Sequence, residues 1–150
     1  MGLLDRLRER GTRADRVAAF VDGPNVLREE FDVDLDEVRE VAARYGRPAI
    51  RRVYLDEDAP SGLVRAAEAR GFEVVVTSGD VDVRLAVDVV RTAVAGDADA
   101  IVVVSRDTDF KPAVEAANAE GLLTVAVAPG SYGRSDALRH AASEHLTLGE

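Results

Sequence analysis

Aspartates follow three apolar stretches of this sequence, at the points where buried strands are predicted to end. Asp22 directly follows Phe20–Val21, Asp82 comes soon after Val74–Val76, and Asp107 and Asp109 come soon after Val102–Val104. Parallel strands bind ligands outside their carboxyl ends, so these four carboxylates are predicted to line one acidic pocket. Carboxylates at such short distances repel each other, and a hard divalent cation relieves the repulsion.

The chemistry of such a pocket follows from its ligand atoms. All-oxygen sites select Mg²⁺, Mn²⁺ or Ca²⁺, and the chain has no cysteine and no histidine near these positions, which disfavours zinc. A Mg²⁺ ion held by few carboxylates keeps water ligands, activates water and neutralises charge on a phosphodiester. The pattern therefore predicts a divalent-cation site that could cleave or transfer phosphate esters.

Five neutral or basic side chains lie among these acids and are candidates for contacting a substrate. Asn25 could orient the first carboxylate or contact a phosphate or a sugar. Ser105 and Thr108 could hydrogen-bond a metal-bound water, and Arg84 and Arg106 could bind a substrate phosphate. The alternatives stay open: ordinary turn hydrogen bonds for the hydroxyls and surface ion pairs for the arginines.

Each acid also has a purely structural interpretation. Asp22 precedes Gly-Pro and could form a turn, while Asp107 and Asp109 could be a turn residue and a helix cap. Asp82 could cap the helix that it is predicted to open. The functional interpretation rests on the joint placement of the four, not on any one of them.

Asp88 is a further candidate for the site. It lies about one and a half turns into the helix that Asp82 is predicted to open, between Arg84 and Arg91. A surface ion pair with these arginines is the alternative. Asp80, just before that helix, is predicted to be a loop acid.

Alternating strands and helices position these residues. Apolar runs predict strands over 17–21, 49–55, 72–77, 98–104 and 122–128, with a short last strand over 146–148. Helices are predicted over 35–45 and 60–70, from Asp82 to about 95, from Thr108 or Asp109 to about 120, and from about 135 to 143. This alternation predicts an α/β fold: a three-layer sandwich with a central parallel sheet of about five strands.

The composition favours one folded domain with a large negative charge. The chain has 150 residues, 47% of them hydrophobic, and a formal net charge of −9. This charge disfavours a general basic surface for nucleic acid, although bound cations can bridge carboxylates to phosphates. Residues 1–15 are the locally basic part and are predicted to form an arm or a short helix.

Several protein classes are disfavoured by patterns that the sequence lacks. No apolar stretch reaches the roughly 18 residues of a membrane span, and the start of the chain lacks the apolar core of a signal peptide. Neither Gly-x-Gly-x-x-Gly nor the Walker pattern occurs, so no nucleotide cofactor is expected. We expect a cytoplasmic protein that does not bind membranes.

Three segments of the chain, Phe20–Asn25, Gly79–Asp88 and Ser105–Phe110, match motifs of one family in order and spacing. Through them the sequence resembles the NYN domain family, a branch of the PIN-like nuclease superfamily, and is similar to an archaeal group of small single-domain members. The likeness covers about Arg16 to Leu148, which implies an NYN domain over residues 16–150.

The resemblance implies a PIN-like sheet and a ribonuclease site that uses Mg²⁺ or Mn²⁺. By position, the residues that match the family's acidic site are Asp22, Asp82, Asp107 and Asp109. Asn25 matches a motif asparagine, and Asp88 matches a further motif position.

Two departures from the family pattern are present. Ser143 stands where many relatives have an aspartate, and Gly79-Asp80 stands where many have a lysine. Both are expected to alter metal affinity or substrate contacts.

The leading hypothesis is a metal-dependent endoribonuclease whose partner is RNA. Asp22, Asp82 and Asp107 would hold Mg²⁺ or Mn²⁺, and Asp109 would complete the site and help deprotonate the attacking water. Two alternatives remain: a catalytically silent module that binds RNA or protein, and a Mg²⁺-dependent phosphotransferase or phosphatase with an aspartyl nucleophile. A homodimer also stays open.

Overall fold

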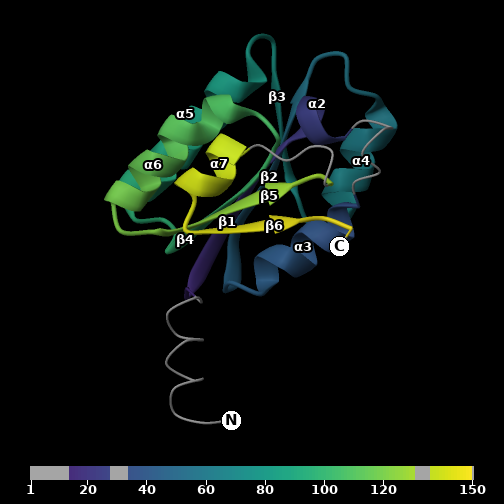
Figure 1. Cartoon of the computed structure of the whole chain (residues 1–150). Helices are drawn as coiled ribbons and strands as arrows, with labels where there is room; N and C mark the ends of the chain where they lie inside the picture. Colours follow the sequence, from purple (N-terminus) through teal and green to yellow (C-terminus); the bar gives the residue numbers. More distant parts are fainter. Residues whose placement is uncertain (1–13, 28–33, 131–135, 150) are drawn as a thin grey trace.

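The computed structural model describes residues 14–27, 34–130 and 136–149 of the chain, which form one six-stranded sheet with helices on both faces (Figure 1). The strands are β1 (Arg16–Asp22), β2 (Arg47–Asp56), β3 (Glu73–Thr77), β4 (Ala100–Val104), β5 (Leu123–Ala128) and β6 (Glu144–Thr147). The helices are α2 (Gly23–Val26), α3 (Leu35–Ala43), α4 (Ser61–Ala69), α5 (Val81–Ala95), the 3₁₀ helix η1 (Thr108–Phe110), α6 (Lys111–Ala119) and α7 (Asp136–Ala141).

The predicted fold class is confirmed. All strand pairs are parallel, and the spatial order is β3-β2-β1-β4-β5-β6. The last apolar segment forms a sixth strand, one more than the approximate count expected. Of the N-terminal arm predicted over residues 1–15, residues 1–13 lie outside the described part of the chain.

The two central strands, β1 and β4, lie side by side although about 80 residues separate them in the sequence. Every residue of β4 is buried, and so is every residue of β1 after Arg16. The chain builds outward from β1 through β2 to β3, then returns to the centre and builds outward again through β5 to β6. The boundary between β1 and β4 is therefore the topological switch point, where ligands bind in sheets of this kind.

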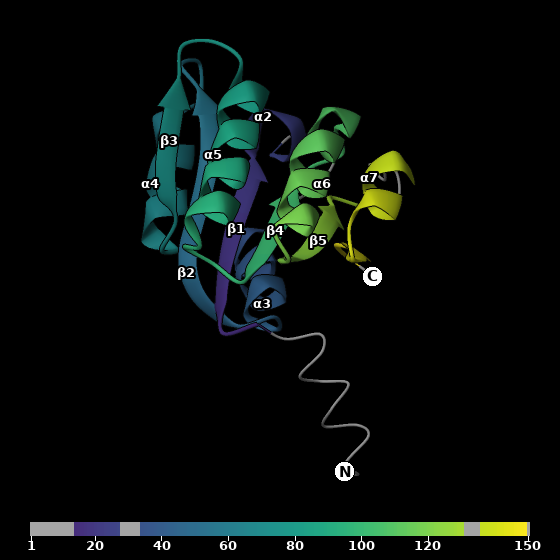
Figure 2. The ribbon, with the colours of Figure 1, turned by 90° about the vertical axis from the view of Figure 1, so that its left-hand side faces the viewer.

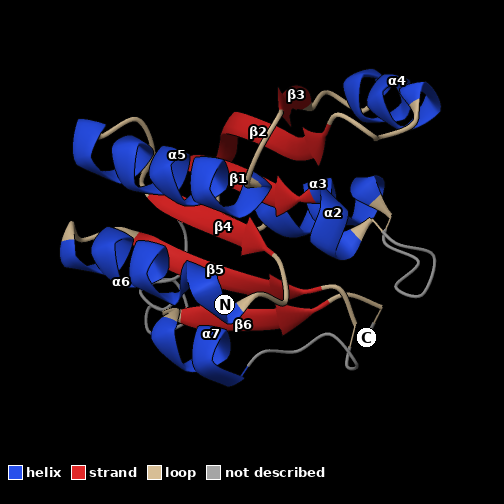
Figure 3. Cartoon of the chain, turned by 90° about the horizontal axis from the view of Figure 1, so that it is seen from above, coloured by secondary structure: helices blue, strands red, loops and turns tan. Residues whose placement is uncertain are grey.

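The helices that come earlier in the chain cover one face of the sheet, and the later helices cover the other face. α3 and α4 pack on one face, around Val21, Val53 and Val102. α5, α6 and α7 pack on the other face, around Phe20, Ile101 and Leu85 (Figures 2 and 3). The connection from β3 through α5 to β4 thus crosses from the edge of the sheet back to its centre. None of the helices within the described ranges has the length and apolar character needed to cross a membrane.

A buried carboxylate fastens α5 to the sheet. Asp88 is only 7% exposed and accepts a hydrogen bond of 2.6 Å from the hydroxyl of Tyr54 on β2. The Nε atom of Arg84 lies 3.3 Å from the same carboxylate, and Nη1 of Arg52 lies 3.9 Å from it. The ion pair with Arg84 that was considered for Asp88 is therefore present, but the carboxylate itself is buried and also ties α5 to β2.

The turn after β1 passes very close to β2. A Cβ atom built on Gly23 would overlap the backbone oxygen of Tyr54 and the side chain of Leu55. Only glycine allows α2 to begin directly after Asp22 at this short distance from the neighbouring strand.

Gly23→Ala is therefore expected to lower the free energy of unfolding by about 2–3 kcal/mol, because backbone and core must shift to admit one methyl group. Gly62→Ala is the matched control, since nothing lies within 4 Å of a Cβ atom built there in α4. The control is expected to raise the free energy of unfolding by about 0.5–1 kcal/mol. Urea unfolding followed by circular dichroism measures both, and equal effects would contradict the close approach at Gly23.

Candidate metal and active site

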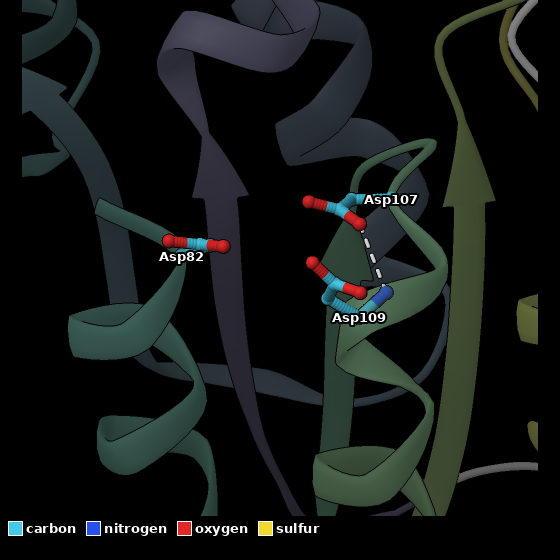
Figure 4. A group of neighbouring side chains, drawn as sticks. All are labelled: Asp82, Asp107 and Asp109. Carbon is cyan, nitrogen blue, oxygen red and sulfur yellow. Dashed lines mark hydrogen bonds between the residues drawn. The ribbon is translucent and has the colours of Figure 1, made fainter. Parts of the chain in front are cut away.

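Three carboxylates converge beyond the carboxyl ends of β1 and β4. Asp82, Asp107 and Asp109 each offer an oxygen atom, and these atoms all lie within 4.8 Å of one another (Figure 4). Asp82 comes from the first turn of α5, whereas Asp107 and Asp109 come from the turn between β4 and α6. The structure therefore brings together three of the four acids that the sequence singled out.

The local structure of the two turns differs from the prediction. α5 begins at Val81 with Asp80 at its N-cap, so Asp82 lies inside the first turn and does not cap the helix. Asp107, not Thr108 or Asp109, caps the following helix: its Oδ1 atom accepts a hydrogen bond of 2.9 Å from the backbone N–H of Asp109. This bond folds the turn back on itself and so brings the Asp109 carboxylate beside that of Asp107.

Asp22 lies next to these three but is more deeply buried. It ends β1, is 4% exposed, and lines a hollow of about 310 Å³ together with Asp82 and Asp107. We call this hollow the acidic pocket; the carboxylates that line it are Asp22, Asp56, Asp80, Asp82 and Asp107.

Ser105 and Asn25 hold the buried side of the acidic pocket. The Ser105 hydroxyl lies 3.2 Å from Oδ2 of Asp22 and 3.3 Å from Oδ1 of Asn25, and it accepts a hydrogen bond of 3.0 Å from the backbone N–H of Asp107. The same Asn25 oxygen accepts a hydrogen bond of 2.9 Å from the backbone N–H of Arg106. These bonds link the end of β1 to the loop after β4, so both side chains position the acids.

Burial raises the pKa of Asp22 to about 6, and the negative charges of Asp107 and Asp82 add to this effect. The hydrogen bonds from Ser105 and from the backbone of Asn25 oppose it, because they stabilise the ionised carboxylate. Asp22 therefore ionises at a higher pH than an exposed aspartate does, and a bound cation would favour its ionised form.

Two further acids of the pocket were not among the predicted site residues. Asp56 ends β2, the neighbour of β1, and is half-buried in the acidic pocket. The signal was present in the sequence, because Asp56 directly follows the apolar end of a predicted strand just as Asp22 does. Asp80, predicted to be a loop acid, is exposed and lines the pocket from the N-cap of α5.

Four predicted site residues lie away from the acidic pocket or at its margin. Arg84 and Asp88 pair with each other along α5 and do not line the pocket. Thr108 is exposed at the start of η1, and Arg106 is half-buried with its backbone held by Asn25. The substrate contacts of Arg84, Arg106 and Thr108 stay predictions, as does the membership of Asp88 in the site.

Ser143, one of the two departures from the family pattern, lies at the opposite end of the sheet. It exchanges hydrogen bonds with Thr124, near the start of β5, and its hydroxyl lies 3.3 Å from Oδ1 of Asn118. The acidic pocket lies at the carboxyl ends of the strands, so Ser143 does not contribute to it. The other departure, Gly79-Asp80, does line the pocket.

The fold and the acidic pocket agree with a family assignment made from the sequence as a whole. The family model for the NYN domain matches residues 16–149, so the chain belongs to the NYN domain family, as its motifs predicted. This family is part of the PIN-like nuclease superfamily.

A curated relative and a solved structure extend the comparison. The chain is 40% identical over 135 residues to the uncharacterized protein MJ0482 of Methanocaldococcus jannaschii, an alignment that covers 90% of this chain but 56% of that protein. The chain thus spans little more than half the length of this archaeal relative. The crystal structure of VPA0982, a protein of unknown function from Vibrio parahaemolyticus, has the same fold, with a TM-score of 0.76 and 21% identity over 92% of this chain and 95% of that one.

The raised pKa of Asp22 predicts how stability depends on pH in the absence of divalent ions. Between about pH 4 and pH 6 the folded protein holds a proton that the unfolded chain releases, so this group makes folding less favourable as the pH rises. Asp22→Asn removes the effect and is expected to raise the free energy of unfolding by about 2 kcal/mol at pH 7.5, but by little at pH 4. Urea unfolding in EDTA at both pH values measures the difference, and an equal change at both would contradict the prediction.

Proposed function

We propose that the chain is a metal-dependent endoribonuclease that hydrolyses RNA phosphodiester bonds at the acidic pocket. The observation that carries this proposal is the convergence of the Asp82, Asp107 and Asp109 carboxylates at the topological switch point. Membership in a family of PIN-like nucleases supports the reaction class, and the choice of RNA as substrate follows from the family resemblance.

The ligand atoms of the pocket fit Mg²⁺ or Mn²⁺. The group consists of carboxylate oxygens alone, and both ions prefer oxygen ligands. The oxygens are within 4.8 Å of one another, a spread that a small rearrangement or a bridging water can accommodate. When bound, such an ion lowers the pKa of water and offsets the negative charge of the phosphodiester in the transition state.

The side chains in and beside the pocket have different proposed roles. Asp82, Asp107 and Asp109, the last beside the pocket, would hold the ion, and Asp22 would join them once its carboxylate is ionised. Asp109, the exposed member of the three, would also help to take up the proton that the attacking water releases. Ser105 and Asn25 hold Asp22 and the turn after β4 in place, as the outer hydrogen-bonding partners of metal ligands do.

Asp107→Asn is expected to lower the rate of cleavage of a labelled single-stranded RNA by at least about 100-fold, because it weakens the ligand set and removes a negative charge facing the ion. The assay uses Mg²⁺ or Mn²⁺ and a range of KCl concentrations. Asp15→Asn is the matched control: it makes the same change of charge at an exposed position before β1, at the other end of the sheet. The control is expected to cleave at the wild-type rate.

Three outcomes of assays with Mn²⁺ separate the proposal from its two rivals. Cleavage that requires the ion and is lost in Asp107→Asn supports a nuclease. Metal-dependent RNA binding without cleavage by the wild type would instead favour a silent binding module. A trapped aspartyl-phosphate would favour a phosphotransferase or phosphatase, since a hydrolytic metal site forms no such adduct.

A further inference from the structure

The outer side of α5 is a row of valines. Four of them follow one another at intervals of four, three and four residues, so they share one side of the helix. They are Val83, Val87, Val90 and Val94, which we call the valine stripe. The opposite side of α5, with Leu85 and Val89, is buried against the sheet.

The valine stripe is largely open to solvent. The exposed fractions of Val83, Val87 and Val94 are 56%, 46% and 64%, whereas Val90 is half-buried. Val76 on the edge strand β3 is 52% exposed, and it lines a hollow of about 530 Å³ together with Val83 and Val87. Within residues 14–27, 34–130 and 136–149, the large apolar side chains that are exposed are therefore gathered on α5 and beside it.

The other long surface helices expose charged side chains instead. The exposed residues of α3 include Asp36, Arg39 and Glu40, and those of α6 include Lys111 and Glu115. No acid of α5 is among its exposed residues, although the whole chain carries a formal net charge of −9. Valine also favours a helix less than alanine, lysine or glutamate does. A row of valines on an exposed helix face therefore marks a surface that a partner covers.

The spacing of the valine stripe suits a second helix as that partner. Apolar residues at alternating intervals of three and four are the pattern by which two helices pack along a shared seam. The stripe extends over eleven residues, which is about 16 Å along the helix axis. The α5 helix of a second copy of the chain carries the same stripe with the same length and spacing.

The charges beside the valine stripe permit contact with an identical copy. A two-fold contact brings one patch against itself, so a patch with charges of a single sign would repel its own copy. The hollow of about 330 Å³ between α5 and the strands β2 and β3 is lined by equal numbers of arginines and acids. They are Arg52, Arg84, Arg91, Glu73, Asp88 and Asp97. This balance avoids the repulsion that the acidic surface elsewhere would cause.

Figure 2 shows the place of this surface in the fold. α5 has α6 on one side and the edge strand β3 on the other. Asp82 belongs to the first turn of α5, but its carboxylate faces Asp107 and Asp109 (Figure 4). A partner on the valine stripe thus leaves the three carboxylates together.

We propose that the valine stripe is a dimer interface, on which α5 of a second copy of the chain packs with its own valine stripe. Val76 extends the apolar contact toward β3. The second copy lies next to the acidic pocket, because the hollow that Val83 and Val87 line shares Gly79 and Asp80 with that pocket. The inference does not depend on the nuclease function proposed above.

Sedimentation equilibrium of the whole chain over a wide range of concentrations tests the proposal. The mass is expected to rise from that of one chain to that of two as the concentration increases. Raising the KCl concentration is expected to strengthen the dimer, because salt screens the repulsion between two copies with the same net charge and leaves an apolar contact intact.

Val87→Glu is expected to raise the dissociation constant of the dimer by at least about 100-fold, because it buries an unpaired carboxylate from each copy in the apolar contact. Ala69→Glu is the matched control: it adds the same charge at an exposed helix position, at the end of α4 on the opposite face of the sheet. The control is expected to dimerise like the wild type.

A second variant separates the interface from the stability of the helix. The triple change Val83→Ala, Val87→Ala and Val94→Ala is expected to weaken the dimer and yet to raise the melting temperature of the dilute monomer, because alanine is the better helix former. If the valines served only the fold of one copy, the triple change would lower that melting temperature.

A single cysteine locates the contact directly, since the chain has none of its own. Val87→Cys lies near the middle of the valine stripe, so the two thiols of a dimer meet whichever way the second helix runs. Mild oxidation is expected to link Val87→Cys into a covalent dimer. The control Ala69→Cys, at the exposed position used above, is expected to stay unlinked.

A wild type that stays monomeric at every concentration overturns the proposal. If Val87→Glu then also lowers the melting temperature, the valine stripe is covered within a single copy. A dimer that survives Val87→Glu and leaves Val87→Cys unlinked overturns the proposal as well, because its interface lies elsewhere.

Discussion

The burial of one carboxylate, that of Asp22, is the constraint on which the rest of the site depends. β1 is covered on both faces and flanked by two strands, so its last residue ends where little water reaches it. An ionised carboxylate in such a place needs hydrogen bonds and a positive charge nearby. The Ser105 hydroxyl and the backbone of Asn25 supply the hydrogen bonds, and a divalent cation would supply the charge.

The topology explains why the acids come from distant parts of the chain. The strand order places β1 against β4, so Asp22 and Asp107 become neighbours at the switch point. α5 starts near the edge strand β3 and crosses the face of the sheet on its way to β4, and its first turn brings Asp82 to the same place. The hydrogen bond from Tyr54 to Asp88 ties α5, whose first turn carries Asp82, to β2.

The sequence predicted the strands and the gathering of the acids well, because continuous apolar runs identify buried parallel strands and such strands share one functional edge. It failed where the direction of a side chain around a helix matters. Nothing local distinguishes Asp88, which points at Tyr54 and is buried, from an exposed partner of Arg84. Asp56 was missed although the same signal, an acid at the end of an apolar run, is present in the sequence; the pairing of β2 with β1 then brings it into the acidic pocket with Asp22.

Ser105 has a single hydroxyl proton, and two acceptors compete for it. Asp22 lies 3.2 Å from the oxygen and Asn25 lies 3.3 Å from it, on the two sides of one rotatable bond. When the carboxylate is negative and has no cation beside it, the hydroxyl turns toward Asp22. When a proton or a cation occupies that carboxylate, the hydroxyl is free to turn toward Asn25. The charge on Asp22 therefore decides which of the two acceptors the Ser105 proton favours.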